Sequence, residues 1–210
     1  MGALSALLLA ALLSFSYKLV EMTLHTLLGK NRFQRMESYW VYGWAVLLIA
    51  AVPFMEGNYA CRLPVDVGFV LPLVVAVLLT NLWIAKYSGY HPVGRRNLAN
   101  FVIFFPVMEE WVYRGAVLPL LNQVLGASSH WELFDLSITG PILLTAFLFA
   151  VSHLQYYRLT RSSLIYMAYA FIGGVVFGAV ADSTQSILFT VVLHIEFNLL
   201  CVYYAKRKPR

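Results

Sequence analysis

Seven apolar runs follow one another along this chain, each roughly as long as a lipid bilayer is thick. They cover residues 3–28, 39–54, 67–85, 97–125, 141–157, 162–181 and 185–205. About 20 apolar residues in a helix cross the hydrocarbon core, where every backbone polar group must be bonded within the protein. Charged residues make up only 12% of the chain, about half the share in a soluble domain. The sequence therefore predicts an all-α, polytopic membrane helix bundle with about seven transmembrane helices.

Seven spans leave little of the 210 residues for anything else, so we expect a single transmembrane domain over residues 1–210. The net charge of +5 does not indicate a nucleic-acid binder, because the basic residues stand at the ends of the spans. If the spans alternate in direction, one side of the membrane receives Lys30, Arg32, Arg35, Lys86, Arg95, Arg96, Arg158, Arg161 and the basic C-terminal tail. The preference of positive loops for the cytoplasm then predicts an outer N-terminus and a cytoplasmic C-terminus.

The connections between the spans carry further expectations. We predict a short basic loop at residues 30–35, a polar loop at residues 126–140 that contains His130, and a turn at residues 182–184. Cys61 falls in a loop and Cys201 in a span, so we expect no disulfide between them. Gly174 and Gly178 are one turn apart and predict a close helix–helix approach.

The fourth span carries the feature that points to function, the segment FPVMEEWVYRG at residues 105–115. Each ionised group inside a bilayer costs roughly 2.5–3.5 kcal/mol even on the lenient insertion scale. At helical spacing Glu110 and Arg114 are neighbours that can neutralise each other, whereas Glu109 points about 100° away around the helix. One carboxylate is thus left for a second partner, and an ionisable residue in the membrane indicates a functional site.

Two later spans carry histidines in similarly apolar surroundings. His153 follows Phe149 by one turn, and His194 precedes Asn198 by one turn. In a small membrane domain these polar groups must find partners inside the bundle, so we expect them to meet the acidic pair. A carboxylate beside a histidine can deprotonate a water molecule, and a second histidine with an amide can donate hydrogen bonds to an oxyanion. This chemistry is that of an amide hydrolase without a serine or cysteine nucleophile.

The three motifs, in this order on successive late helices, resemble those of the CPBP intramembrane protease family. This family, also called Abi or CAAX-protease-like, includes the type II CAAX prenyl endopeptidases, and the resemblance covers about residues 97–205 as the protease core. It implies that Glu109 and His153 activate water and that His194 and Asn198 form the oxyanion site. It also implies that Glu110 and Arg114 hold the motif helix and that Phe149 packs beside the site.

The resemblance implies an endopeptidase that cleaves a membrane-anchored protein or peptide, such as a CAAX-like or sorting-tail substrate. The small size, with little outside the bundle, favours a bacterial or archaeal plasma membrane. Members are often labelled metalloproteases, and Glu109, His153 and His194 are the three ligands that zinc would use. We favour a metal-free glutamate mechanism, because the sequence has no His-Glu-x-x-His helix. Two other functions remain open: a non-catalytic bacteriocin-immunity or scaffold protein, and a small proton-coupled transporter.

Overall fold

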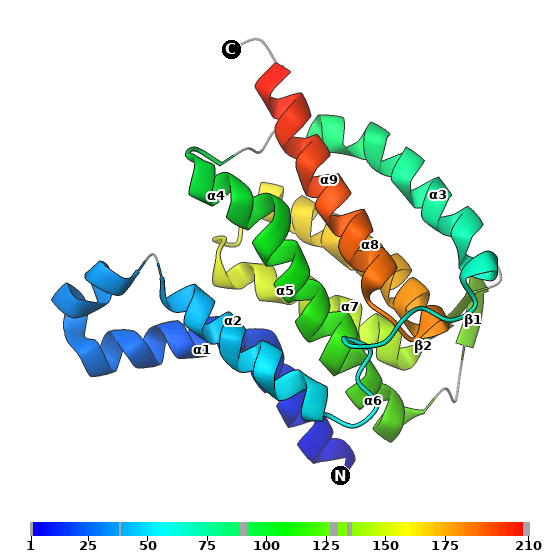
Figure 1. Cartoon of the computed structure of the whole chain (residues 1–210), viewed down its shortest axis with the longest axis horizontal. Helices are drawn as coiled ribbons and strands as arrows, with labels where there is room; N and C mark the ends of the chain where they lie inside the picture. Colours follow the sequence, from blue (N-terminus) through cyan, green and yellow to red (C-terminus); the bar gives the residue numbers. More distant parts are fainter. Residues whose placement is uncertain (1, 38, 89–91, 127–129, 134–135, 208–210) are drawn as a thin grey trace.

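The structure is a computed structural model that describes residues 2–37, 39–88, 92–126, 130–133 and 136–207. It consists almost entirely of helices, with one short antiparallel hairpin (Figure 1). The α-helices and strands are α1 (Ala3–Met36), α2 (Trp40–Ala51), α3 (Val67–Ile84), α4 (Arg95–Ala99), α5 (Phe105–Val112), α6 (Leu118–Leu125), β1 (His130–Leu133), β2 (Leu136–Thr139), α7 (Gly140–Ser152), α8 (Arg161–Thr184) and α9 (Leu188–Arg207).

The predicted all-α membrane bundle is confirmed. Within the described ranges, four helical stretches are long and apolar enough to cross a membrane: Ala3–Met36, Val67–Tyr87, Arg161–Thr184 and Leu188–Arg207. Two shorter apolar helices cover Trp40–Phe54 and Gly140–Gln155. The remaining predicted span lies in residues 95–125, which are helical throughout and carry the three charges of the motif. Many large apolar side chains on these helices are exposed, as is expected of surfaces that face lipid.

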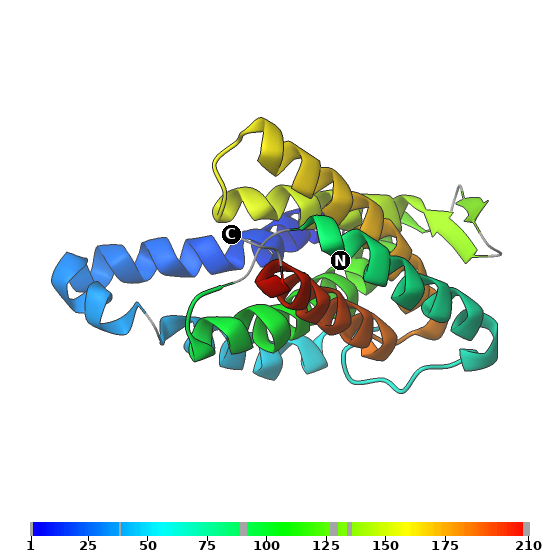
Figure 2. The same ribbon diagram turned by 90° about the horizontal axis from the view of Figure 1, so that it is seen from above.

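The motif-bearing helix at residues 95–125 runs through the middle of the bundle (Figure 1). One hydrophobic cluster packs it against α1, α2 and α7, and a second cluster joins its lower part to α3, α8 and α9. Figure 2 shows that the far half of α1 extends beyond the rest of the bundle. The charged motif is therefore enclosed by apolar helices, while α1 contacts the bundle mainly through its first half.

Two widened, π-helical turns interrupt this central helix, η3 (Asn100–Phe104) and η4 (Tyr113–Val117). Each ends two residues before a proline, Pro106 or Pro119. Proline has no N–H to donate to the carbonyl four residues earlier, so the normal helical ladder cannot continue there. The carbonyl of Gly115 stands four residues before Pro119, and it accepts instead from the N–H of Tyr59 at 3.0 Å. The glutamates thus lie between two turns of altered register, a feature often found at functional sites.

Three predictions about the connections are wrong. Residues 30–35 are helical, because α1 continues to Met36 across a kink at Gly29, which has a φ of 70° that glycine tolerates. Residues 182–184 belong to the last turn of α8, and the chain reverses at Gln185 instead. The polar stretch around His130 was expected to be a loop, but it forms the β1–β2 hairpin. Hydrogen bonds between the two strands satisfy backbone N–H and C=O groups there.

The glycines of α8 let two helices approach closely, as their spacing predicts. A Cβ atom on Gly174 would lie 3.1 Å from the Cβ of Ala146, and one on Gly178 would lie 2.9 Å from the side chain of Ile142. Both contacts are with α7. This packing brings α7 and α8 together over the central helix. Cys61 and Cys201 are both free, which is also as expected.

Basic residues from several helices gather at one end of the bundle. Lys86, just beyond α3, lies 5.7 Å from the ring centre of Tyr204 near the end of α9. Arg96 at the start of α4 lies 5.5 Å from the ring of Tyr39 before α2. This is the arrangement that alternating spans require, and the preference of positive loops for the cytoplasm predicts that this end faces inward.

A hydrogen-bonded group that we call the loop latch consists of Tyr59, Asn122, Asp182 and Gln185. The hydroxyl of Tyr59 donates to Asp182 at 2.9 Å and accepts from Asn122 and Gln185, each at 3.2 Å. Burial, and then the negative charge of Asp182, raise the pKa of Tyr59 to about 12, so its hydroxyl keeps the proton that it donates. The latch ties the 55–66 loop to the ends of α6 and α8.

Candidate active site

A buried ion pair on the central helix forms the base of the site. Nη1 of Arg114 donates to Oε1 of Glu110 at 3.1 Å, and both side chains are completely buried. Nη2 of Arg114 also donates to the carbonyl of Gly174 at 3.3 Å. The pair expected from the i,i+4 spacing is present, and it joins the central helix to α8. Each charge requires the other, since one left alone in this setting would be strongly destabilising.

His194 connects this pair to the second glutamate. Its Nδ1 lies 2.8 Å from Oε1 of Glu110, and its Nε2 lies 3.6 Å from Oε2 of Glu109. The His194 side chain is 13% exposed and that of Glu109 is 24% exposed. A residue of α9 thus lies between two adjacent carboxylates of α5, as the convergence of the polar motifs predicts. The π-helical turn η4 begins directly after α5, at Tyr113.

These contacts fix where the protons lie. The carboxylate of Glu110 is held ionised by Arg114 and can only accept, so Nδ1 of His194 carries a hydrogen. Nε2 then faces Glu109, where a lone pair and a carboxylate would repel each other. A second hydrogen on Nε2 removes this repulsion and makes His194 a cation between the two carboxylates. With that proton present the charges of the two glutamates, His194 and Arg114 sum to zero.

Phe149 of α7 lies at the centre of the aromatic and cationic contacts. The guanidinium carbon of Arg114 is 4.6 Å from its ring centre, and the rings of His153 and His194 are 5.0 and 6.2 Å from it. Cation–π contact of this kind is favourable where water is excluded. Phe149 therefore packs beside the ion pair and both imidazoles.

His153, in the short turn η5 (His153–Gln155), is oriented by its own helix. Its Nδ1 lies 2.9 Å from the carbonyl of Phe149, and because a carbonyl only accepts, Nδ1 carries the hydrogen and Nε2 remains an acceptor. Among the described residues, no ion-pair contact within 4.0 Å joins His153 to Glu109. The structure brings His153 to Phe149 but not into direct contact with the glutamate.

Asn198 is buried one turn beyond His194 and reaches the first widened turn of the central helix. Its Nδ2 donates to the carbonyl of Phe101 at 2.8 Å. In η3 the N–H of Phe105 bonds to Asn100 rather than to Phe101, and this shift in register makes the contact with Asn198 possible. A carboxamide has two N–H groups, so this contact uses only one of them.

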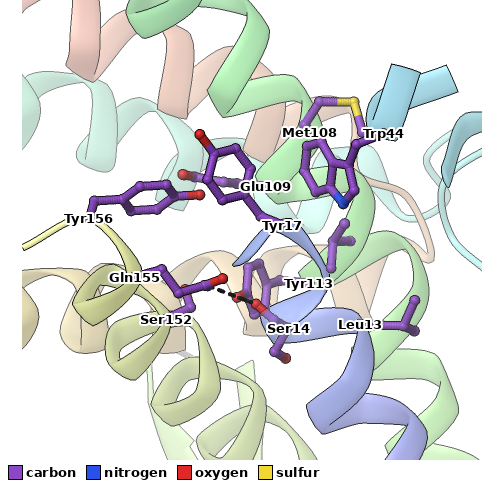
Figure 3. A pocket seen from close by; sticks show the side chains of 11 residues that line it. Leu13, Ser14, Tyr17, Trp44, Met108, Glu109, Tyr113, Ser152, Gln155 and Tyr156 are labelled. Carbon is purple, nitrogen blue, oxygen red and sulfur yellow. Dashed lines mark hydrogen bonds between the residues drawn. The ribbon is translucent and has the colours of Figure 1, made fainter. Parts of the chain in front are cut away.

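A cavity of about 20 Å³, taken as the room open to the centre of a water molecule, lies beside Glu109. That is enough for one water, which needs about 10–15 Å³. Figure 3 shows Glu109 at this cavity next to the rings of Tyr17 and Tyr156. The residues that line it come from α1, α2, α5, η4, the end of α7, and η5 with the residue after it: Leu13, Ser14, Tyr17, Trp44, Met108, Glu109, Val112, Tyr113, Ser152, Gln155 and Tyr156.

The three zinc ligands that the sequence suggests do not form a ligand set here. Within the part of the chain that the structure describes, no three His, Cys, Asp or Glu side chains are grouped closely enough to hold a metal ion. The reason is geometric, because His194 spans the two glutamates while His153 turns toward the carbonyl of Phe149. In this arrangement the three residues do not fit a zinc site.

The first helix contributes to this site, which no motif in the sequence predicts. Ser14 and Tyr17 come from α1, and Gln155 and Tyr156 follow His153, yet all four line the cavity of Glu109. Ser14 and Gln155 are polar residues in apolar spans, and such residues must find partners inside the bundle. That signal was available in the sequence, but it does not say which partner each residue finds.

Glu196 is a further carboxylate on α9 that stands apart from this site. Its Oε2 accepts from Nδ2 of Asn81 at 2.7 Å, and the same amide donates to the carbonyl of Leu193 at 3.3 Å. Two residues from His194, it points toward α3 rather than toward the glutamates of α5. It fastens α9 to α3.

Residues 95–200 match the family model described as Type II CAAX prenyl endopeptidase Rce1-like, which is half of the chain. This range contains the central helix, both histidines and Asn198, and it leaves out α1, α2 and α3. No curated protein and no solved structure matches the chain.

Proposed function

The chain belongs to the Rce1-like family of type II CAAX prenyl endopeptidases, and from this premise we propose that it hydrolyses a peptide bond in a membrane-anchored substrate with water activated by Glu109. The family makes it an intramembrane endopeptidase of the CAAX type. The observation that carries the mechanism is the position of the Glu109 carboxylate, whose Oε2 lies 3.6 Å from Nε2 of His194 and beside a cavity with room for one water. A general base needs a water within reach and a partner that tunes its proton affinity.

In the proposed reaction Glu109 takes a proton from the water, and the resulting hydroxide attacks the substrate carbonyl carbon. We assign a second hydrogen bond to this water to the acceptor Nε2 of His153, whose ring packs on Phe149 beside the site. Collapse of the tetrahedral intermediate breaks the C–N bond, and the proton held by Glu109 passes to the leaving nitrogen. One water is consumed, and one carboxyl group and one amine are released.

The negative oxygen of the intermediate needs donors. We assign this role to Nε2–H of His194 and to the second N–H of Asn198, which is not used by Phe101. Glu110 supports His194 by accepting from Nδ1, so the imidazole presents Nε2 to the site. Arg114 keeps Glu110 ionised for this task. Arg114, Glu110 and His194 are thereby linked in one chain of hydrogen bonds.

The substrate proposed is a lipidated peptide with a short C-terminal tail, in keeping with the family description. We propose that the enzyme works in a bacterial or archaeal plasma membrane with its basic end in the cytoplasm. A membrane-embedded site suits such a substrate, because the lipid anchor holds the peptide at the depth of the bundle. This confinement raises the effective concentration of substrate without new contacts.

The test is cleavage by purified protein in lipid nanodiscs. The probe is a farnesylated CAAX-type peptide with a fluorophore and a quencher on either side of the expected bond, and mass spectrometry identifies the product. We expect cleavage by the wild type and a loss of about 10²–10⁴-fold in Glu109→Gln, the usual contribution of a general base. Glu196→Gln is the matched control, because it also removes a membrane carboxylate but lies outside the site.

Equal cleavage by the wild type and Glu109→Gln would refute the role of this glutamate. Elemental analysis and treatment with strong chelators separate the glutamate mechanism from a zinc mechanism. We expect the rate to be unchanged after chelation and no zinc to be present at one equivalent. Loss of activity on chelation with recovery on adding zinc would favour the metal mechanism.

A further inference from the structure

The first helix lies outside the segment that matches the family, yet it forms one wall of the proposed active site. The match begins at residue 95, whereas Leu13, Ser14 and Tyr17 of α1 line the cavity of Glu109. Figure 3 shows the Tyr17 ring at the Glu109 side chain. The motif residues therefore do not complete the site without α1.

Gln155 fastens this wall in place. Its Nε2 donates to the carbonyl of Ser14 at 3.1 Å, and its Oε1 accepts from the backbone N–H of Lys18 at 3.1 Å. These two backbone groups are one helical turn apart, so a single side-chain amide bridges the turn at residues 14–18. The hydroxyl of Tyr113 donates to the same Ser14 carbonyl at 3.1 Å. The turn that carries Tyr17 is thus fixed against the central helix and the end of α7.

The rings of two tyrosines at this cavity, Tyr17 and Tyr156, are held by packing, whereas their hydroxyl groups are not held by hydrogen bonds. The ring centre of Tyr17 is 4.7 Å from that of Trp40, 5.6 Å from that of Trp44 and 5.0 Å from that of Tyr156. No described residue makes a hydrogen bond to the hydroxyl of Tyr17 or of Tyr156, although both residues line the cavity. In Figure 3 the hydroxyl of Tyr156 points toward Glu109. Donors on rings that are already fixed lose little entropy when they bind a ligand.

We propose that Tyr17 and Tyr156 are substrate-positioning residues, whose hydroxyls donate hydrogen bonds to main-chain carbonyls of the substrate peptide next to the bond that is cut. This inference rests on the proposed endopeptidase function. The adjacent carboxylate of Glu109 disfavours an anionic ligand group, so a neutral acceptor fits this position. A peptide carbonyl is such an acceptor, and every substrate residue supplies one. The aromatic faces of Tyr17 and Trp44 form the apolar wall around it.

The test compares Tyr17→Phe and Tyr156→Phe with the wild type in the nanodisc assay. Phenylalanine keeps the ring contacts and removes only the hydroxyl. Losing one hydrogen bond to substrate is expected to raise KM by about 3- to 10-fold while kcat changes by less than about 2-fold. In a Glu109→Gln background, the Kd of the same farnesylated peptide, measured by fluorescence anisotropy, should rise by the same factor. Tyr169→Phe on α8 is the control, since this tyrosine is exposed and does not line the cavity.

The outcomes separate this inference from the function on which it rests. If the wild type does not cleave or bind the peptide, the proposed function fails and the inference fails with it. If the wild type cleaves while both tyrosine variants keep the wild-type KM and Kd, only the inference is overturned. A lower melting temperature with unchanged KM would mean that the hydroxyls stabilise the fold and do not contact the substrate, which also overturns it.

Discussion

The active-site cluster and the loop latch are both polar networks that hold helices together, but they are satisfied to different degrees. In the latch, Oδ1 of Asp182 accepts from Tyr59 at 2.9 Å and from Asn122 at 2.6 Å. In the cluster, Oε2 of Glu110 and Nε of Arg114 are buried without a hydrogen-bond partner among the described residues. Glu109 in turn faces a cavity.

This difference shows how to separate polar groups that stabilise a membrane protein from those that react. A latch whose donors and acceptors are satisfied by one another lowers the energy of the folded state and has nothing left to give to a ligand. Incomplete satisfaction costs stability, and it is retained where a ligand or a transferred proton is to be bound. The following variants test whether one network only stabilises the fold while the other reacts, and the most disruptive variant comes first.

Arg114→Met should have the largest effect, because it leaves the buried charge of Glu110 without its partner. We expect unfolding to become easier by about 3–5 kcal/mol and cleavage to be lost. Glu110→Gln combined with Arg114→Met removes both charges and should recover most of the melting temperature. Cleavage should not return, since His194 no longer has an ionised carboxylate at Nδ1. Recovery of both properties in the double variant would show that the pair only fastens helices.

Asn198→Ala should lower kcat by about 10²–10³-fold, the usual cost of removing one oxyanion donor. Its stability should fall by about 1 kcal/mol for the lost bond to Phe101. The matched variant is Asn122→Ala in the latch, which removes the same side chain and its bonds to Tyr59 and Asp182. It should lower the melting temperature without changing kcat. A comparable loss of kcat in both variants would contradict the division between the networks.

Gly115→Ala tests the contact through which the 55–66 loop reaches the motif helix. A Cβ atom there would lie 2.9 Å from the Cβ of Ala60, so the loop must shift, at a cost of about 1–3 kcal/mol. Gly173→Ala is the control, because a Cβ atom there meets nothing within 4 Å. In the interior of α8 that alanine should stabilise the protein by up to about 1 kcal/mol. Equal melting temperatures for the two variants would show that the loop can shift away from the added methyl group at no cost in stability.

Tyr59→Phe should have the smallest effect. It removes the hydroxyl at the centre of the latch, and three hydrogen bonds with it. Because Asn122 still donates to Asp182, we expect a loss of only about 0.5–1.5 kcal/mol, with cleavage unchanged. Thermal unfolding and the nanodisc assay measure both quantities. A marked drop in cleavage would show that the latch controls the active site from a distance.

Most of the fold could be predicted from the sequence, because membrane-spanning helices are specified by length and hydropathy alone. The approach of α7 and α8 at Gly174 and Gly178 followed from spacing, and so did the pairing of Glu110 with Arg114. The kink at Gly29 and the hairpin after α6 could not be predicted in this way. Both depend on which of several acceptable local conformations the rest of the chain favours.

Hydropathy and motif spacing are enough to identify this chain as a helical membrane protein with two carboxylates, an arginine, two histidines and an amide in its later spans. Which of these groups meet depends on how the helices pack. His194 lies between both glutamates, while His153 bonds to its own helix, and α1 brings Tyr17 to the site from outside the matched segment. Hydropathy and helical period fix what a residue can do within its own helix. The contacts between helices depend on packing, and here on two proline-linked turns whose register no local pattern specifies.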